Sequence, residues 1–422
     1  MAAKNEAYCL VLGGGGAKGV YHIGAWKALR ELGVPVNAFV GNSIGAIIAG
    51  FLAQGAYDEL EKIGDTITVD TILKLPAALV KNGELKLGND ALGSIFKIIT
   101  EGKGLDTSPL RRTLEGVIDE DALRRTGNDL GVVTVSAANL APSEVFLESM
   151  EKGTLVDYLM ASSAFPGFAM SKIDGKNYLD GGLSNNVPYD MARKRGYKNI
   201  IVLDISGAGI VKQADISGSR TVYIKNSIRM GAEFDFSRKF LDEYRLLGYL
   251  DTKKAFGALD GWAYFVKPDP AAERRFSAFV AKKISPEPIL AAWSGAVPEK
   301  MRHDRRRLLR LMDCCASILA LPRIAEYTYA GLAAAIAEKK AGEDARIAEF
   351  TALAEKSGRK VFDEVVVAAI KEKRFDASPY YYHRLVEAMA GGKTRAVLDR
   401  ILAGLHPELA AGLQYLDVGF LL

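Results

Sequence analysis

The chain has 422 residues, of which 49% are apolar and 25% charged, and its formal net charge is +4. This composition is typical of a globular protein with a large core, and the small net charge argues against a nucleic-acid-binding protein. We find no run of roughly 20 apolar residues that would span a membrane and no apolar segment of a secretory signal. The 3 cysteines predict neither a disulfide framework nor a metal site. We therefore expect a cytoplasmic protein.

The first predicted elements are a buried strand and a helix, separated by a run of glycines. The strand covers Tyr8–Leu12 and the helix Val20–Leu32. Glycine is less favourable than alanine in regular structure by roughly 0.5–1 kcal/mol, so such a run indicates backbone amides that must come close to a ligand. Amides and the dipole at the start of a helix favour negative charge. We therefore expect this glycine loop, with Gly14, Gly15 and Gly16, to bind an anion, stably or transiently.

The glycine loop also fits two nucleotide-binding patterns, which remain an alternative. Gly14, Gly16 and Gly19 match the G-x-G-x-x-G pattern of dinucleotide-binding folds. The next predicted strand, Asn37–Val40, does not end near the acidic residue that would hold a ribose. A phosphate-binding P-loop needs a Ser or Thr directly after its Lys, and Lys18 has none. An anion other than a nucleotide is therefore the favoured ligand.

The sequence GNSIG follows this strand and has the G-x-S-x-G form of a nucleophile elbow. Gly41 and Gly45 flank the serine because a side chain at either position would collide with the neighbouring strand and helix. Ser43 is pushed out at the turn into the apolar helix Ile44–Ala53, where amides of the glycine loop would face the oxyanion that forms on attack. The alternative is an ordinary strand-to-helix turn with Ser43 as the helix cap.

The stretch 70–100 mixes apolar residues with lysines and comes before the next predicted strands, Leu130–Ser136 and Val145–Glu148. Such a mixture is found in lids and in segments that lie at a bilayer surface. Surface helices with solvated lysines are an equal alternative.

A serine nucleophile needs a base, and the histidines are poor candidates for it. None of the 4 has the setting of a base: His22, His303, His383 and His406. Asp180, in YLDGGLSNNVP, is followed by Gly181 and Gly182, which allow a tight turn shortly after the helical segment ASSAFPGF. An ordinary Asp–Gly turn is the alternative. Phe165 and Phe168 of that segment would exclude water from the site and so raise the pKa of Asp180. A carboxylate of raised pKa is a better base.

Further along the chain, Asn199–Ile205 is predicted as a strand, and 220–226 and 261–268 as candidate strands. Strands that alternate with helices up to about residue 205 indicate an α/β domain around a mostly parallel sheet. From about residue 271 the pattern is almost only helical. We expect a boundary near the prolines of KPDPAAE, with a catalytic domain at 1–270 and a helical C-terminal region of unknown role at 271–422.

The glycine loop GGGAKG, the elbow GNSIG, the segment ASSAFP and the DGG motif occur in this order. Together they resemble the patatin-like phospholipases, over roughly residues 7–205. The resemblance implies a three-layer α/β/α core and a Ser–Asp dyad in place of a triad, with Ser43 as nucleophile and Asp180 as general base. The implied oxyanion hole consists of the amides of Gly14, Gly15 and Gly16. The residues that support these motifs are Lys18, Gly19, Gly41, Gly45, Gly181 and Gly182.

The resemblance also implies a lipid acyl hydrolase that cleaves carboxylic esters of phospholipids or lysophospholipids through an acyl-enzyme, without a cofactor. Peripheral contact with a membrane is part of this expectation. The basic face of the segment 301–312, with Arg302, Arg305, Arg306 and Arg310, is a second candidate for that contact. A solvated face packed on its apolar side is the favoured interpretation there. The hypothesis from another class is a non-catalytic module, whose glycine loop holds an anion or nucleotide and whose helical tail binds a partner.

Overall fold

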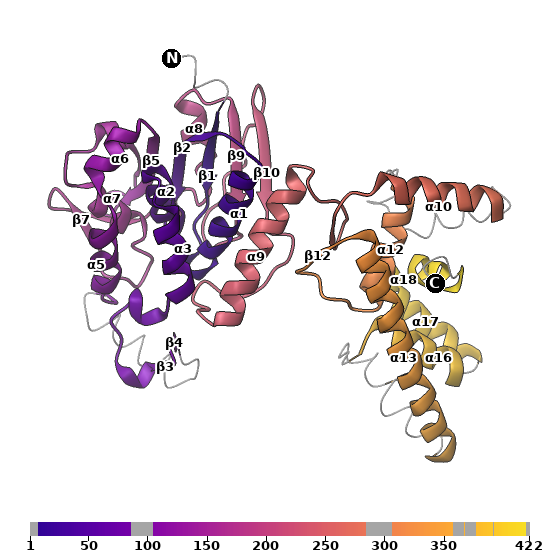
Figure 1. The fold of residues 1–422 in the computed structure, drawn as a ribbon. Helices are drawn as coiled ribbons and strands as arrows, with labels where there is room; N and C mark the ends of the chain where they lie inside the picture. Colours follow the sequence, from indigo (N-terminus) through magenta and orange to yellow (C-terminus); the bar gives the residue numbers. More distant parts are fainter. Residues whose placement is uncertain are drawn as a thin grey trace. The chain divides into compact units, whose positions relative to one another are not determined.

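The computed structural model describes residues 7–85, 104–283, 306–357, 367, 377–390 and 392–418. The chain divides into two compact units, Met1–Phe256 and Gly257–Leu422. Figure 1 shows the helices and strands of each unit. The first unit contains every motif of the site predicted above, and the functional roles expected for the two regions stay predictions.

An eight-stranded sheet forms the centre of the first unit. Its strands are β1 (Tyr8–Leu12), β2 (Val36–Asn42), β5 (Asp129–Ser136), β6 (Pro142–Phe146), β7 (Ser171–Ile173), β8 (Lys176–Asp180), β9 (Asn199–Asp204) and β10 (Arg220–Lys225). They lie in the order β10-β9-β1-β2-β5-β8-β7, and β6 also pairs with β5. Strands β10, β9, β1, β2 and β5 are parallel, whereas β6 and β8 run antiparallel to β5. The expected α/β class with a mostly parallel sheet is confirmed.

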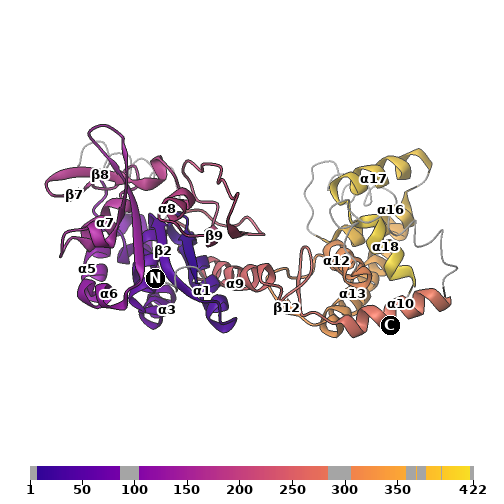
Figure 2. The ribbon, with the colours of Figure 1, turned by 90° about the horizontal axis from the view of Figure 1, so that it is seen from above.

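Helices cover both faces of this sheet and give the three layers that were expected. The helices of one face are α1 (Val20–Glu31), α2 (Ile44–Gln54), α3 (Tyr57–Thr66), α7 (Leu155–Ser162) and α9 (Arg238–Ala255). The other face carries α8 (Tyr189–Lys194), and Figure 2 shows α8 and α1 on opposite sides of the strands. Alternation along β1 explains both layers. Cys9 and Val11 share a buried cluster with Met191 of α8, while Leu10 and Leu12 are buried toward the other side.

The register of the strands brings the predicted site residues to one edge of the sheet. Leu12 at the end of β1 pairs with Gly41 near the end of β2. Because the carboxyl ends of neighbouring parallel strands share an edge, the loops that follow β1 and β2 meet there. β8 runs antiparallel to β5, so it enters the sheet at this edge. It ends at Asp180, which pairs with Thr134 near the end of β5. The glycine loop, the elbow and the DGG motif therefore converge.

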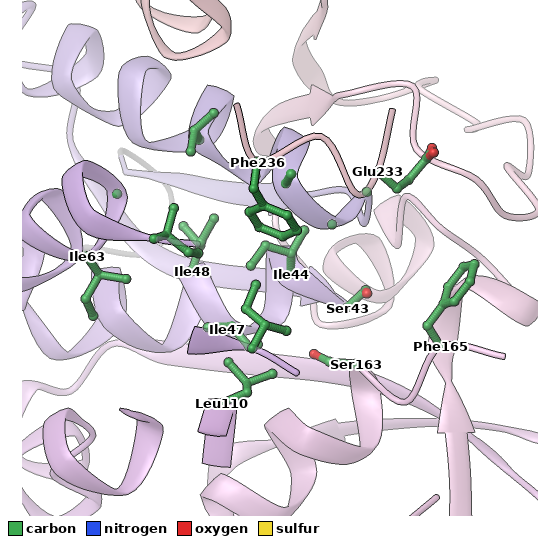
Figure 3. Close-up of a pocket in the computed structure, with 18 of the residues that line it drawn as sticks. Ser43, Ile44, Ile47, Ile48, Ile63, Leu110, Ser163, Phe165, Glu233 and Phe236 are labelled. Atoms are coloured by element: carbon green, nitrogen blue, oxygen red, sulfur yellow. The ribbon is translucent and has the colours of Figure 1, made fainter. Parts of the chain in front are cut away.

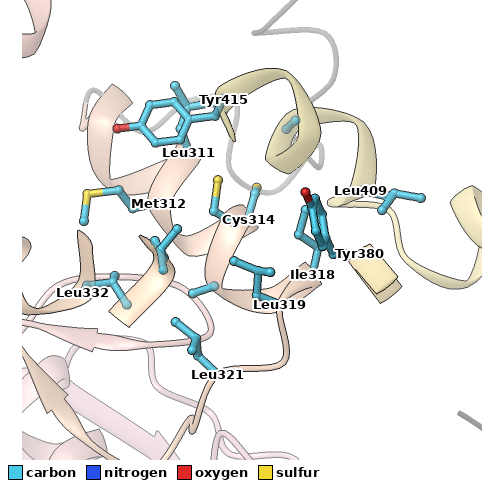
Figure 4. Packing of buried hydrophobic residues seen from close by; sticks show 14 of the residues in the cluster. Leu311, Met312, Cys314, Ile318, Leu319, Leu321, Leu332, Tyr380, Leu409 and Tyr415 are labelled. Atoms are coloured by element: carbon cyan, nitrogen blue, oxygen red, sulfur yellow. The ribbon is translucent and has the colours of Figure 1, made fainter. Parts of the chain in front are cut away.

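The second unit is built almost only from helices, as the sequence predicts. They are α10 (Pro270–Lys283), α12 (Arg307–Ile318), α13 (Tyr329–Ser357), α16 (Pro379–Met389), α17 (Gly392–Leu405) and α18 (Leu409–Val418). Two short strands, β11 (Phe265–Val266) and β12 (Glu326–Tyr327), pair in parallel. In the core of this unit, Leu311 and Ile318 of α12 share one buried cluster with Leu332, Tyr380 and Leu409 of three other helices (Figure 4).

The expectations about the two surface segments change with the structure. Residues 86–100 of the first segment and 301–305 of the second lie outside the described residues. The expected basic face is wrong for Arg310, which is only 5% exposed because α12 is buried on nearly every side.

None of the helices in the described part of the chain combines the length and the apolar content that a membrane crossing requires.

The carboxylate of Asp313 in α12 organises the start of the second unit. Its side chain is fully buried. It accepts hydrogen bonds from the backbone amides of Trp262, Ala263 and Tyr264, at 2.7, 3.1 and 3.3 Å. One side chain therefore satisfies a whole turn of the chain that would otherwise have buried, unpaired amides.

We expect Asp313→Ala to lower the free energy of unfolding by about 2–4 kcal/mol, because it leaves these amides without an acceptor. Asp269→Ala is the control: among the described residues the carboxylate of Asp269 accepts one backbone amide, that of Ala272 at the start of α10, and lies 4.0 Å from the exposed Arg275, so its loss should cost about 1 kcal/mol. Calorimetry of the full chain measures both changes. Equal melting temperatures for the two variants would contradict the role of Asp313.

Candidate active site

Ser43 occupies the turn between β2 and α2 in a backbone conformation that residues other than glycine rarely adopt. Its φ is 54° and its ψ is −130°. Such a conformation persists only where the surrounding structure enforces it. Here a Cβ atom on Gly41 would lie 2.3 Å from the carbonyl oxygen of Gly45, and one on Gly45 would lie 2.3 Å from that of Leu12. The turn is therefore too tight for a side chain at either glycine.

The backbone of this elbow is also fixed from the side of α7. The amide of Ser43 donates a hydrogen bond to the Oγ of Ser162 at 2.9 Å, and Ser162 is fully buried. The ASSAFP segment thus contributes a support for the elbow that its sequence did not reveal.

Asp180 lies at the end of β8 with one carboxylate oxygen occupied and the other free. Oδ1 accepts a hydrogen bond from the amide of Gly182 at 2.7 Å. Oδ2 is buried and has no hydrogen-bond partner among the residues that the structure describes. Burial raises the pKa of Asp180, and the Gly182 amide and the side chains of Ser43 and Asn42 offset part of this effect. A buried carboxyl group of raised pKa beside a serine hydroxyl has the properties of a general base.

The glycine loop passes beside Ser43 and presents two amides that are available to a ligand. A Cβ atom on Gly14 would lie 3.0 Å from the Cβ of Ser43, so the glycine loop and the elbow are in contact. The amide of Gly14 donates to the carbonyl of Asn186 at 3.1 Å. Within the described ranges, the amides of Gly15 and Gly16 make no hydrogen bond, and both glycines line the same cavity as Ser43. Of the three glycines expected at the oxyanion hole, Gly15 and Gly16 thus have amides to offer.

Lys18 of the GGGAKG motif is held in an ion pair. Its Nζ lies 3.2 Å from the Oε1 of Glu233 and 3.2 Å from the carbonyl oxygen of Ser206. Burial alone would raise the pKa of Glu233, but its own backbone amide and the charge of Lys18 outweigh burial and lower it. Glu233 also accepts hydrogen bonds from the amides of Ala17 and Ala208. Lys18 therefore ties the glycine loop to the loop that contains Glu233.

His22 supports the glycine loop from α1 and is not placed as a base. It is fully buried, and its Nε2 donates a hydrogen bond to the carbonyl oxygen of Gly13 at 2.9 Å. Burial lowers the pKa of His22 to about 4, so its imidazole is neutral.

As for metal ligands, no group of three or more His, Cys, Asp or Glu side chains that could hold an ion occurs among the described residues.

Ser43 and Asp180 line an apolar cavity of about 130 Å³. Figure 3 shows Ile47, Ile48 and Ile63 lining it on the side that leads away from the serine. These side chains come from α2 and α3. The cavity is thus a largely apolar site that includes a few polar side chains, among them Ser43 and Asp180, as expected for a pocket that binds an apolar chain.

Three phenylalanines gather at this cavity. Phe165, Phe168 and Phe234 all line it and contact one another edge to face, with ring centroids 5.7–6.0 Å apart. The sequence led us to expect Phe165 and Phe168 beside the site, whereas Phe234 comes from a segment that carried no motif. Their apolar surface excludes water, which is consistent with the burial that raises the pKa of Asp180.

The comparison with known families covers the same residues. Residues 10–193 match the family described as patatin-like phospholipase. The match includes the glycine loop, Ser43 and Asp180, which the fold has brought together. This segment is a patatin-like phospholipase domain. The family resemblance predicted from the four motifs is thereby confirmed.

The chain spans only a small part of the length of the curated relatives that it matches. Patatin-like phospholipase domain-containing protein 6 of Homo sapiens is 31% identical over 211 residues, which are 49% of this chain and 14% of that protein. Lysophospholipase NTE1 of Cryptococcus neoformans is 28% identical over 217 residues, which are 50% of this chain and 12% of that protein. Among solved structures, VipD from Legionella pneumophila has a TM-score of 0.40 at 13% identity, over 97% of this chain and 90% of that chain.

Asp180 should lower the stability of the patatin-like domain at neutral pH. Because its folded pKa is above the ordinary value of about 3.9, its contribution to stability is full below that value and is lost as the pH rises through the folded pKa. We expect Asp180→Asn, which keeps an acceptor for the Gly182 amide but no charge, to raise Tm at pH 7 and to lose this advantage near pH 4. Asp121→Asn, which changes an exposed carboxylate, is the control. A lower Tm for Asp180→Asn at pH 7 would contradict the expectation.

Proposed function

We propose that the patatin-like domain is a lipid acyl hydrolase of the phospholipase A or lysophospholipase type. One observation carries the proposal: four residues line one apolar cavity, namely Ser43, Asp180, Gly15 and Gly16. Among the described residues, the Oδ2 of Asp180 and the amides of both glycines have no hydrogen-bond partner. An acyl chain suits the walls of this cavity, and its ester carbonyl would then lie at the serine. The family match and a relative named lysophospholipase support the same class of substrate.

In this mechanism Ser43 is the nucleophile and Asp180 the general base. Oδ2 takes the hydroxyl proton while Oγ attacks the ester carbonyl. The amides of Gly15 and Gly16 stabilise the negative charge that forms on the carbonyl oxygen. When the tetrahedral intermediate collapses, the alcohol leaves with the proton from Asp180 and the acyl group stays on Ser43. A water molecule, deprotonated by Asp180, then attacks the carbonyl carbon of the acyl-enzyme. When this second intermediate collapses, the bond from the carbonyl carbon to Oγ breaks, Asp180 returns the proton to Ser43, and the fatty acid leaves.

The apolar surroundings are what make a carboxylate adequate for this role. An Asp with the ordinary pKa of about 3.9 is a weak proton acceptor for a serine hydroxyl. Burial raises the pKa of Asp180 and so increases its affinity for the proton. A bound acyl chain would exclude water further and strengthen the same effect.

An enzyme that hydrolyses phospholipids has to reach them at a lipid surface. Apolar side chains are exposed on loops next to the cavity. Leu183 is 41% and Ile210 is 56% exposed. Asp180 and Ala208 line the cavity. Leu183 lies shortly after Asp180 in the chain, and Ile210 lies shortly after Ala208. A hydrogen bond of 2.9 Å from the amide of Ile210 to the carbonyl of Gly182 joins the two loops. These loops are the proposed place of peripheral contact with a bilayer.

A fluorophosphonate probe should label the wild-type protein at Ser43, because such probes react with activated serines. Ser43→Ala should lose both the labelling and the hydrolysis of a short-chain nitrophenyl ester while keeping its circular dichroism spectrum. Ser163→Ala is the matched control, since Ser163 lines the same cavity but donates its hydroxyl to the carbonyl of Leu159 at 3.0 Å. A folded Ser43→Ala with near-wild-type turnover would end the catalytic proposal and favour the module whose glycine loop only binds an anion.

Asp180→Asn should reduce kcat by about 10²–10⁴-fold, the usual contribution of a general base. His22→Gln should keep most of the activity, because His22 is neutral and its Nε2 is bound to Gly13. In the wild type, kcat/KM should fall as the pH is lowered through the raised pKa of Asp180, since only the ionised carboxylate accepts the proton. A pH profile with a soluble ester measures this. A His22→Gln variant that is folded but as inactive as Asp180→Asn would replace the dyad with a mechanism that includes the histidine.

A further inference from the structure

Two buried asparagines connect the proposed base to the glycine loop. Asn42, directly before Ser43, is fully buried, and Asn186, shortly after Asp180, is 2% exposed. The Nδ2 of Asn42 donates to the Oδ1 of Asn186 at 2.9 Å and to the Oδ1 of Asp180 at 3.4 Å. One side-chain amide therefore lies between the carboxylate and a second amide.

Asn186 continues this connection to the glycine loop. Its Nδ2 donates to the carbonyl oxygens of Gly14 and Gly207, both at 3.2 Å. Its own carbonyl oxygen accepts the amide of Gly14 at 3.1 Å, so Asn186 holds both hydrogen-bonding groups of this glycine. A Cβ atom on Gly14 would lie 2.4 Å from the Oδ1 of Asn186, and glycine is therefore required there.

The orientation of both side-chain amides follows from their neighbours. Asn42 faces one oxygen of Asp180 and one of Asn186, so its nitrogen has to point toward them. Asn186 faces the carbonyl oxygens of Gly14 and Gly207, which require a donor. Turning either amide over would set oxygen against oxygen at hydrogen-bond distance. The network therefore has one consistent arrangement.

We propose that Asn42 and Asn186 are positioning residues that couple the base to the oxyanion-binding amides. This inference rests on the proposed function. Asn42 and the amide of Gly182 occupy the Oδ1 of Asp180 and leave Oδ2 to take the proton of the serine. Asn186 fixes Gly14 and, through it, the next amide along the chain, which belongs to the oxyanion hole. Asn42 joins the two ends, because its one nitrogen donates to both.

The two ends of this network affect different measurable quantities. Within the described chain, the groups that act on the pKa of Asp180 besides burial are the Gly182 amide and the side chains of Ser43 and Asn42, and none of them carries a charge. A donor on the carboxylate favours its ionised form, so loss of Asn42 raises the pKa of Asp180. A donor on the Gly14 carbonyl instead positions the amide that stabilises the transition state, so its loss lowers kcat more than it changes substrate binding.

The first experiment is the pH profile of Asn42→Ala on a soluble short-chain nitrophenyl ester, with Asn42→Ser as a smaller change at the same place. We expect the acid limb of the kcat/KM profile to shift to higher pH by about half to one pH unit. At pH values above this limb, kcat/KM should change less. Asn185→Ala is the matched control. Asn185 is also buried, but its Oδ1 accepts the backbone amides of Val187 and Lys212. It should keep the wild-type acid limb even if its Tm falls.

Asn186→Asp tests the other end of the network. The new carboxylate keeps an acceptor for Asn42 but offers no donor to the carbonyl of Gly14. On the alkaline plateau, where Asp180 is ionised in every variant, kcat should fall by about 10–100-fold while KM changes little. The control Asn185→Ala should keep its kcat on the same plateau.

The outcomes separate the coupling from the proposed function. A shifted acid limb in the Asn42 variants together with a loss of kcat in Asn186→Asp supports the coupling. An unchanged acid limb in folded Asn42→Ala or Asn42→Ser overturns it, and if Ser43→Ala is inactive in the same assay the proposed function stands. A fully active Ser43→Ala overturns the proposed function itself. If Asn42→Ala does not fold, Asn42→Ser provides the same measurement.

Discussion

The close contact between the elbow and the end of β1 is the constraint on which the site depends. Gly45, in the first turn of α2, packs against the carbonyls of Leu12 and Gly13 with no room for a Cβ atom. The parallel pairing of β1 with β2 sets this distance, because both strands end at the same edge of the sheet. With the elbow held there, the serine lies beside the glycine loop. Any widening of the gap would separate the proposed nucleophile from the amides of Gly15 and Gly16.

Around this contact the domain keeps several groups in states that oppose folding. Ser43 has a positive φ, the carboxyl group of Asp180 is buried, and Lys18 is only 9% exposed. Strain and buried charge persist only where the surrounding packing is strong. The central strands supply that packing, since β1, β2 and β9 are buried along nearly their whole lengths. Stability therefore comes from the strands, and the reactive groups lie on the loops at their ends.

The strands of this core can be predicted from the sequence, because continuous apolar runs have no other favourable place than a buried sheet. The run Tyr8–Leu12 is β1 with the same bounds, and Ser43 stands out because glycines surround it. The partners of such residues are not predictable in this way. Lys18 and Glu233 are 215 positions apart, and no local pattern marks a pair that only the fold brings together. Arg310 shows the converse: its charge suggests a surface position, but a helix buried on nearly every side takes it inside.

The family match ends at residue 193, but the folded domain does not. β9 pairs with β1, α9 packs along α1, and Glu233 holds Lys18, and all three lie beyond that residue. A fragment cut at the end of the match would leave one edge of β1 open and the glycine loop without its counter-ion. The shortest fragment of this chain that keeps the site intact therefore runs to the end of α9. The residues from 194 to 255 are an integral part of the fold rather than a linker to the helical unit.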